Sequence, residues 1–292
     1  MEVETIAVIG AGTMGRGIAY ASALAGYRTI LEDISEARLE QAVAWIEKAL
    51  DESVSRGKAD PANRLAAMKH VATASKVENA IREAELIIEA VPEEMEMKLE
   101  LFTIFDKFAK AGAVFASNTS SLSITEISEV TVYRERCIGM HFFNPVPKMK
   151  LIELIKTPQT SDETIATCRE VGRRMNKDVV VVKDSAGFVT SRVSALISNE
   201  AFALLETDIA SARDIDKALR LGLNHPMGPL ELADLVGLDV CLKVLEYLHQ
   251  TLGEKYKPSP LLQKYVWEGR LGRKSGRGVY DYPQQEIPSN MK

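Results

Sequence analysis

The chain has 292 residues, which is enough for one large domain or two ordinary ones. Its hydrophobic content of 46% and charged content of 26% are those of an ordinary globular protein. A net charge of -5, with lysines and arginines spread along the chain, gives no electrostatic case for nucleic acid or an anionic membrane as a partner.

The sequence also shows no membrane, disulfide or metal signature. No apolar run approaches the roughly 20 residues that a spanning helix needs, and a strand is predicted so soon after Met1 that we expect no signal or transit segment. Cys137, Cys168 and Cys241 lie far apart without a CxxC pair, which favours reduced thiols. No His, Cys, Asp and Glu cluster has metal-ligand spacing. We therefore expect a cytoplasmic protein without a metal site.

Strand-like and helical segments alternate through the first part of the chain. Apolar strands are predicted at residues 5–9, 28–32, 86–88, 114–116, 137–142, 151–155 and 178–182. Helices are predicted at residues 13–25, 36–56, 99–109 and 163–175. This alternation predicts an α/β fold of the Rossmann type, with a largely parallel sheet and helices on both faces.

The pattern changes after Asp184, and no convincing strand follows. Helices are predicted at residues 189–206, 212–221, 230–252 and 261–267, separated by glycines and prolines. We place a domain boundary near Gly187. Residues 1–186 are then the Rossmann domain, and residues 187–292 form an all-helical C-terminal domain.

The first predicted strand runs directly into a glycine-rich turn, Gly10-Ala11-Gly12-Thr13-Met14-Gly15. In such a GxGxxG turn, the first glycine permits the tight bend, the second lets the backbone approach a pyrophosphate, and the third lets helix and strand pack closely. Free N–H groups at the start of the helix then bind the anion. Asp33 ends the second strand, where a carboxylate accepts hydrogen bonds from ribose hydroxyls.

The expected cofactor is NAD. A carboxylate at position 33 repels a 2′-phosphate, which disfavours NADP. FAD uses a similar fingerprint, but no second flavin-type segment is visible. A glycine-rich turn that binds nothing is the remaining interpretation.

A histidine and a glutamate are predicted to face each other on two neighbouring strands. If residues 137–142 and 151–155 pair in antiparallel fashion about a turn centred near Pro147, His141 lies opposite Glu153. A carboxylate among apolar residues is costly unless it is paired. The pair is either a buried structural contact or a catalytic base whose imidazole is oriented by the carboxylate.

Ser117-Asn118-Thr119-Ser120-Ser121 forms a polar cluster after another predicted strand. Its hydroxyls are candidates for binding a substrate oxygen or the nicotinamide carboxamide. The alternative is a cap for a following helix, because serine and threonine favour such positions.

Taken together, these motifs resemble the L-3-hydroxyacyl-CoA dehydrogenases, nearest to the 3-hydroxybutyryl-CoA dehydrogenase branch. The resemblance runs essentially end to end. The segments that carry it are the glycine-rich turn, residues 117–122, Gly139-Met140-His141-Phe142-Phe143-Asn144-Pro145, Pro226-Met227-Gly228-Pro229 and Leu271-Gly272-Arg273-Lys274-Ser275-Gly276.

The resemblance implies NAD-dependent oxidation of an (S)-3-hydroxyacyl-CoA to the 3-ketoacyl-CoA, or the reverse reaction. It implies His141 as the base and Glu153 as its partner. The residues implied near the substrate oxygen or the cofactor are Ser120, Asn144, Glu93, Lys98 and Lys274.

Further expectations rest on the resemblance alone. It implies an acyl-CoA thioester as the substrate and a homodimer formed through the helical domain. It places Arg56 and Lys58, at the end of the second predicted helix, where the family meets the CoA phosphates.

One position departs from the family pattern. Where the family reads Gly-Phe-x-x-Asn-Arg at the domain junction, this chain reads Gly187-Phe188-Val189-Thr190-Ser191-Arg192. The family asparagine hydrogen-bonds within the active site, and a shorter hydroxyl would reach the same place only through water. We expect activity with an altered rate or substrate preference.

Two alternatives remain open at this stage. The same scaffold could oxidise a free hydroxy acid or sugar acid instead of a thioester. It could also bind NAD without catalysis, although the paired His141 and Glu153 argue against that interpretation.

Overall fold

The computed structural model describes residues 1–57 and 60–282. Contacts divide the chain into two compact units, Met1–Ser185 and a second that begins at Ala186. Within the described residues, no helix combines the length and apolar composition that crossing a bilayer requires.

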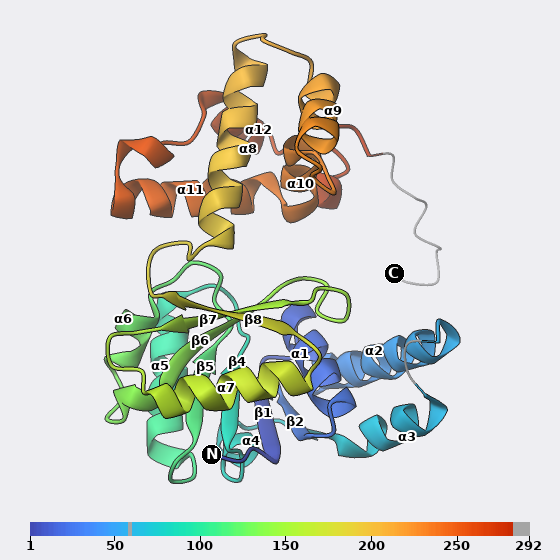
Figure 1. Ribbon diagram of the computed structural model, residues 1–292, viewed down its shortest axis with the longest axis vertical. Coiled ribbons are helices and arrows are strands. Elements are labelled where there is room, and N and C mark those ends of the chain that lie inside the picture. Colours follow the sequence, from blue (N-terminus) through green and yellow to red (C-terminus); the bar gives the residue numbers. More distant parts are fainter. Residues whose placement is uncertain (58–59, 283–292) are drawn as a thin grey trace. The chain divides into compact units, whose positions relative to one another are not determined.

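The first unit is built on an eight-stranded sheet in the order β3-β2-β1-β4-β5-β6-β7-β8 (Figure 1). The strands are β1 Thr5–Ile9, β2 Arg28–Glu32, β3 Val71–Ala74, β4 Leu86–Glu89, β5 Val114–Ser117, β6 Cys137–Phe142, β7 Leu151–Lys156 and β8 Asp178–Lys183. Every neighbouring pair is parallel except β6 and β7, which are antiparallel. The predicted largely parallel sheet is confirmed.

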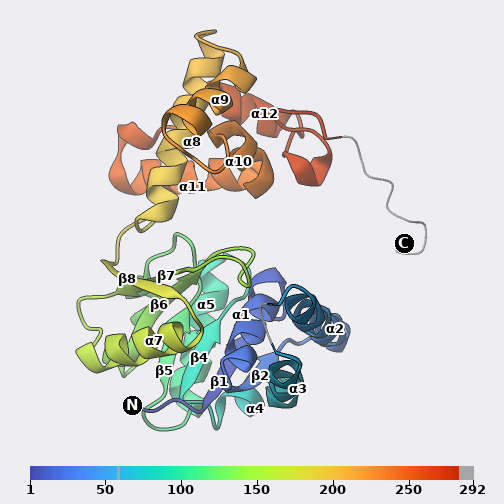
Figure 2. The same cartoon turned by 45° about the vertical axis from the view of Figure 1, so that its right-hand side comes forward.

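Helices connect these strands and cover the sheet. They are α1 Thr13–Leu24, α2 Glu36–Ser55, α3 Pro61–His70, α4 Val77–Ile81, α5 Met95–Phe108, α6 Ile124–Ser128 and α7 Asp162–Arg174, with a short 3-10 helix at Arg134–Arg136. Helix α7 lies in front of the sheet in Figure 1, and α5 lies behind it. The turned view of Figure 2 shows the same two layers.

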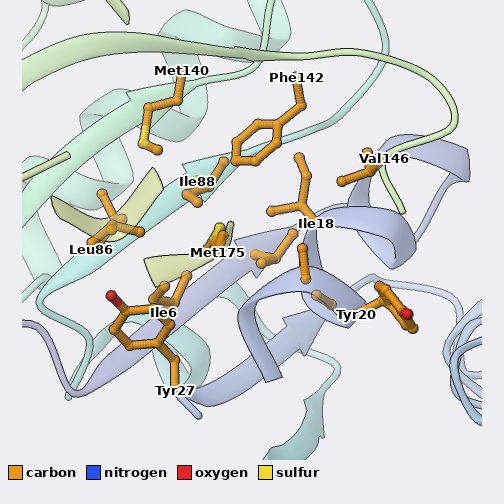
Figure 3. Packing of buried hydrophobic residues seen from close by; sticks show 14 of the residues in the cluster. Ile6, Ile18, Tyr20, Tyr27, Leu86, Ile88, Met140, Phe142, Val146 and Met175 are labelled. Carbon is orange, nitrogen blue, oxygen red and sulfur yellow. The ribbon is translucent and has the colours of Figure 1, made fainter. Parts of the chain in front are cut away.

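Alternating side chains of the strands supply the two faces of the sheet. On one face, Leu86 and Ile88 of β4 and Met140 of β6 pack toward Ile18 of α1 and Met175, which follows α7 (Figure 3). These residues are buried because strands inside a parallel sheet are covered by helices on both sides.

The opposite face carries an aromatic cluster. Phe115, next to Ala116 on β5, points away from the first core and meets Phe102 and Phe105 of α5 at ring-centroid distances of 6.3 and 5.9 Å. All three rings are buried. The two cores hold the sheet rigidly, so that the ends of its strands are fixed in space.

The second unit is helical. Its helices are α8 Thr190–Glu206, α9 Ala212–Gly222, α10 Pro229–Val236, α11 Leu238–Leu252 and α12 Pro260–Trp267, with 3-10 helices at Glu254–Tyr256 and Arg273–Ser275. Phe202, Leu230, Leu245 and Leu262 are fully buried in its core.

Two buried carboxylates tie the helical unit together. Asp216 of α9 accepts hydrogen bonds from the backbone N–H groups of Leu230 and Glu231 at 2.8 and 3.0 Å, at the start of α10. Asp234 accepts from the N–H groups of Val279 and Tyr280 at 2.8 and 2.9 Å. The first bond set satisfies donors that a helix start leaves without intrahelical partners.

The structure corrects one predicted helix and adds elements that were not predicted. The single helix predicted over residues 230–252 is wrong, because the chain breaks at Gly237, whose φ of 109° lies outside the helical region. The two helices α10 and α11 take its place. Strand β3 and helices α3 and α4 were not predicted at all.

Candidate active site

The turn between β1 and α1 has the shape that an anion site needs. Gly10 has φ of 101°, and a Cβ there would lie 2.8 Å from the carbonyl oxygen of Ala90. A Cβ on Gly15 would lie 1.7 Å from the carbonyl oxygen of Gly10, so only glycine lets the helix pack this close to the turn. No side chain caps the start of α1 at Gly12, and nothing lies within 4 Å of the Cβ that Gly12 lacks.

This turn fits a pyrophosphate. The N–H groups at the start of α1, at Thr13 and Met14, have no side-chain cap, and the backbone at Gly12 is open to a close approach. A helix N-terminus of this kind favours negative charge through its N–H groups and its dipole.

Asp33 lies beside the turn, where it follows β2. Its side chain accepts hydrogen bonds from the N–H groups of Ala11 at 3.0 Å and Ser35 at 2.9 Å. The residue is 7% exposed. The carboxylate is therefore fixed next to the glycine-rich turn, where ribose hydroxyls would lie in a dinucleotide site.

His141 and Glu153 face each other across β6 and β7. The two residues are register partners in the antiparallel pair, as predicted from the turn near Pro147. Nδ1 of His141 lies 2.9 Å from Oε2 of Glu153, and both residues are buried. The imidazole also packs against Phe143 at a centroid distance of 4.4 Å. The ring is thus held from two sides near the carboxyl end of β6.

The serine-rich segment after β5 is organised by Glu93. One oxygen of Glu93 accepts hydrogen bonds from the Thr119 hydroxyl at 2.5 Å and from the N–H groups of Ser120 and Ser121 at 2.9 and 3.2 Å. The cap of the following helix α6 is Ser123, whose hydroxyl accepts from the N–H of Glu126. Residues 117–121 therefore do not cap that helix.

The same segment is joined to the histidine strand. Asn118 accepts a hydrogen bond from the N–H of Phe142 through its side-chain oxygen at 2.9 Å. Since Phe142 follows His141, this bond ties the serine-rich segment to the strand that carries the imidazole.

Lys98 is held in the interior by two acidic residues. It is 1% exposed, and its Nζ lies 2.8 Å from Glu89 and 3.4 Å from Glu93. Glu89 ends β4, and sequence reasoning did not select it as a site residue. The only signal was an acidic residue at the end of the apolar run Leu86–Glu89.

Asn144 lies in the connection between β6 and β7, joined to Pro145 by a cis peptide bond. Nζ of Lys177 donates hydrogen bonds to the carbonyl oxygens of Val146 and Met149, at 2.5 and 2.6 Å, and so holds this connection. Val146 packs beside Gly17 of α1, where a Cβ would lie 3.0 Å from its side chain. Lys177 was also not selected from the sequence.

The structure brings together most of the predicted site residues of the first unit. The glycine-rich turn, Asp33, Glu93, the segment 117–121 and the His141 pair follow or end β1, β2, β4, β5 and β6. In parallel strands these carboxyl ends meet at one edge of the sheet, and the chain connections diverge between β1 and β4, where open α/β sheets bind ligands.

The remaining predicted residues belong to the helical unit or follow α2. Ser191 is the second residue of α8 in the helical unit, and Lys274 of that unit forms an ion pair with Asp239 at 2.5 Å. Arg56 follows α2 and pairs with Glu52 at 3.4 Å. Lys58 lies outside the described residues.

The strand order and the glycine-rich turn together define a dinucleotide-binding protein of the Rossmann class. Comparison with known proteins narrows this class. Residues 5–185 match the NAD-binding domain of 3-hydroxyacyl-CoA dehydrogenase, and residues 187–282 match the C-terminal domain of the same family.

Individual relatives are similar over nearly their whole length. The chain is 43% identical to a probable 3-hydroxybutyryl-CoA dehydrogenase of Bacillus subtilis, over 98% of this chain and 99% of that protein. It is 39% identical to the mitochondrial hydroxyacyl-coenzyme A dehydrogenase of Homo sapiens, over 96% and 91% of the two chains. The crystal structure of (S)-3-hydroxybutyryl-CoA dehydrogenase from Ralstonia eutropha superimposes with a TM-score of 0.93 at 40% identity, covering 96% of this chain and 99% of that one.

The chain belongs to the 3-hydroxyacyl-CoA dehydrogenase family. Its reaction class is the NAD-dependent oxidation of 3-hydroxyacyl-CoA, as the sequence motifs predicted.

Proposed function

We propose that this enzyme interconverts (S)-3-hydroxybutyryl-CoA and acetoacetyl-CoA, with His141 as the general base and Glu153 as its orienting partner. The observation that carries the proposal is the buried hydrogen bond between these two side chains at the ligand-binding edge of the sheet. The short acyl chain is supported by the relatives from Bacillus subtilis and Ralstonia eutropha, whose names specify the 3-hydroxybutyryl substrate.

In this proposal the imidazole takes the proton of the substrate hydroxyl. Because Nδ1 bonds to Glu153, Nε2 is the ring nitrogen that exchanges this proton. The Glu153 carboxylate fixes the ring and stabilises the imidazolium that forms. When bound, NAD⁺ supplies the acceptor for the hydride that leaves C3 of the substrate as the hydroxyl becomes a carbonyl.

The other predicted residues have positioning and binding roles. Gly10, Gly12, Thr13, Met14 and Gly15 hold the pyrophosphate, and Asp33 holds the adenosine ribose. Ser120 and Asn144 bind near the substrate oxygen and the nicotinamide, and Ser191 has the role in the reaction that the family resemblance implies for its position. Glu93, Lys98 and Lys274 complete the cofactor site, while Arg56 and Lys58 meet the CoA phosphates.

The proposal also assigns roles to the two domains. Residues 1–186 bind NAD, and residues 187–292 contribute to the substrate site and form a homodimer. Exposed apolar side chains on the helical unit, such as Leu221 and Leu223 at 74% and 67% exposure, support the dimer. We place the enzyme in the cytoplasm, which agrees with its three free cysteines.

The test is acetoacetyl-CoA-dependent oxidation of NADH by the wild type and by the His141→Ala variant. We expect the variant to lose at least about a hundredfold in kcat, because general acid–base catalysis contributes roughly 10²–10⁴. Glu153→Gln should also lower kcat, since the ring keeps a hydrogen-bonding neighbour but loses the charge that stabilises the imidazolium. NADH binding by both variants serves as the control for folding.

Full activity in His141→Ala would refute the assigned base. A free 3-hydroxy acid tested beside the CoA thioester separates the proposed substrate from the alternative class. Faster turnover of the free acid would overturn the thioester assignment while leaving the base assignment intact.

A further inference from the structure

A network of charged side chains lies beneath the ligand-binding edge of the sheet, near the ends of β4 and β5. Glu89 is fully buried, and its two oxygens bind different partners. One accepts from Lys98 Nζ and from the N–H of Val91, both at 2.8 Å, and the other accepts from the Ser117 hydroxyl at 2.6 Å. Lys98 also connects this network to Glu93, because its Nζ lies 3.4 Å from Oε2 of Glu93.

The charges of the side chains in this network do not cancel. Two carboxylates, Glu89 and Glu93, share the single ammonium of Lys98, so the group carries one excess negative charge. Glu89 and Lys98 are 0% and 1% exposed, whereas Glu93 is 40% exposed. The buried pair therefore fixes the outer carboxylate, and the excess charge is presented at the edge of the sheet.

The strand order indicates which part of a dinucleotide meets this charge. Asp33 after β2 lies on the adenosine side, and the glycine-rich turn after β1 takes the pyrophosphate. The next strands in the sheet are β4 and β5, and Glu93 and Ser120 lie in the segments that follow them. The nicotinamide half is thus directed toward Glu93.

We propose that Glu93, held by the buried Glu89–Lys98 pair, raises the affinity of the site for NAD⁺ relative to NADH. The inference rests on the proposed placement of NAD in the first domain. The nicotinamide ring is positively charged in NAD⁺ and neutral in NADH, so a fixed carboxylate near it stabilises only the oxidised form. Glu93 would then set the balance between the two cofactor forms, in addition to holding the Ser120 segment.

The two roles of Glu93 are separable by an isosteric substitution. Glu93→Gln keeps a side-chain oxygen that can accept from the Thr119 hydroxyl and from the N–H groups of Ser120 and Ser121. It removes the charge and replaces the oxygen that faces Lys98 Nζ at 3.4 Å by an amide nitrogen, while Lys98 keeps its 2.8 Å contact to Glu89. Glu94→Gln is the matched control, because it removes the same charge from the next residue, which is exposed at the start of α5.

The experiment measures Kd for NAD⁺ and for NADH without any substrate, by calorimetry and by NADH fluorescence. In Glu93→Gln we expect the ratio Kd(NAD⁺)/Kd(NADH) to rise about three- to tenfold, the range for one charge interacting across a partly solvated site. Glu94→Gln should leave the ratio near the wild-type value.

A second variant tests the buried pair. Glu89→Gln removes the excess charge at depth while its amide can still bond to Lys98 and Ser117, and we expect the ratio to shift in the same direction by a smaller factor. If both Kd values change equally in Glu93→Gln, or the ratio moves equally in Glu94→Gln, the proposal is overturned. Since no turnover is measured, neither outcome depends on whether His141 is the base.

Discussion

Two acidic side chains follow one another where β2 ends, and the structure treats them differently. Asp33 accepts two backbone N–H groups and is fixed beside the glycine-rich turn. Glu32 is 5% exposed. Burial, with smaller contributions from Asp33 and Glu78, raises the pKa of Glu32 from 4.5 to about 7. The Asp33 carboxylate is thus held where it can bind a ligand. The Glu32 carboxylate instead destabilises the folded protein when it is ionised, because it is buried.

The raised pKa makes a prediction for stability. The folded protein keeps the Glu32 proton between pH 4.5 and about 7, whereas the unfolded chain loses it there, so this group lowers the free energy of unfolding as pH rises through that window. Glu32→Gln should therefore stabilise the protein more above pH 7 than at pH 4.5. Urea unfolding at the two pH values measures the difference. Glu40→Gln, on an exposed position of α2, is the control, and an equal gain at both pH values would contradict the assignment.

At the scale of elements, the junction of β1 and α1 decides both folding and cofactor binding, through different glycines. Gly15 is required by packing, because a Cβ would lie 1.7 Å from the carbonyl oxygen of Gly10. Gly12 is not required by packing, since the space around its missing Cβ is open and its φ of -67° suits any residue. The open space at Gly12 is what a ligand that approaches the backbone requires.

This contrast predicts opposite phenotypes for two alanine substitutions. Gly15→Ala should lower the free energy of unfolding by about 1–3 kcal/mol or more, because the methyl group pushes the helix away from the turn. Gly12→Ala should unfold like the wild type yet bind NADH on the order of tenfold more weakly, because its methyl group occupies the approach of the pyrophosphate. Urea unfolding and NADH fluorescence titration on both variants provide the measurements. Normal NADH binding by Gly12→Ala would show that the pyrophosphate does not lie at this turn.

Local patterns predicted the central elements because periodicity and burial agree there. The apolar runs of β1, β2 and β4 lie inside the sheet with a strand on either side, and the His141–Glu153 pairing followed from counting residues about Pro147. Strand β3, at the sheet edge, has exposed residues among its four and gave no apolar run to read. Strand β3 is held by backbone pairing with β2, and this pairing does not require a pattern in its side chains.

The sequence was least informative about contacts made across elements. The Glu89–Lys98 pair joins the end of β4 to the first turns of α5, and its burial depends on how that helix packs on the sheet. Similarly, Lys177 reaches carbonyl groups that precede β7, a contact set by the tertiary fold alone. The break at Gly237 was missed because apolar spacing continues through it in both α10 and α11. Only the positive φ of that glycine reveals the turn.

At the scale of the whole molecule, the two units differ in how densely they expose apolar side chains. Each unit has nine exposed large apolar side chains, but the described part of the helical unit is much the shorter of the two. Those of the helical unit are Val189, Val193, Ile209, Leu221, Leu223, Leu235, Val236, Val240 and Trp267. Apolar surface concentrated in this way is typical of association sites. It favours self-association through the helical domain rather than through the NAD-binding domain.

The proposed homodimer gives the last prediction. Wild-type enzyme should sediment at twice the mass of one chain, and the double variant Leu221→Glu/Leu223→Glu should sediment as a single chain, because carboxylates buried in an apolar interface lose their hydration. Both leucines are exposed, at 74% and 67%, so the change should leave folding intact. Leu65→Glu, at a 58% exposed position of α3 in the first unit, is the matched control and should remain dimeric. A double variant that still sediments as a dimer would place the interface away from the end of α9.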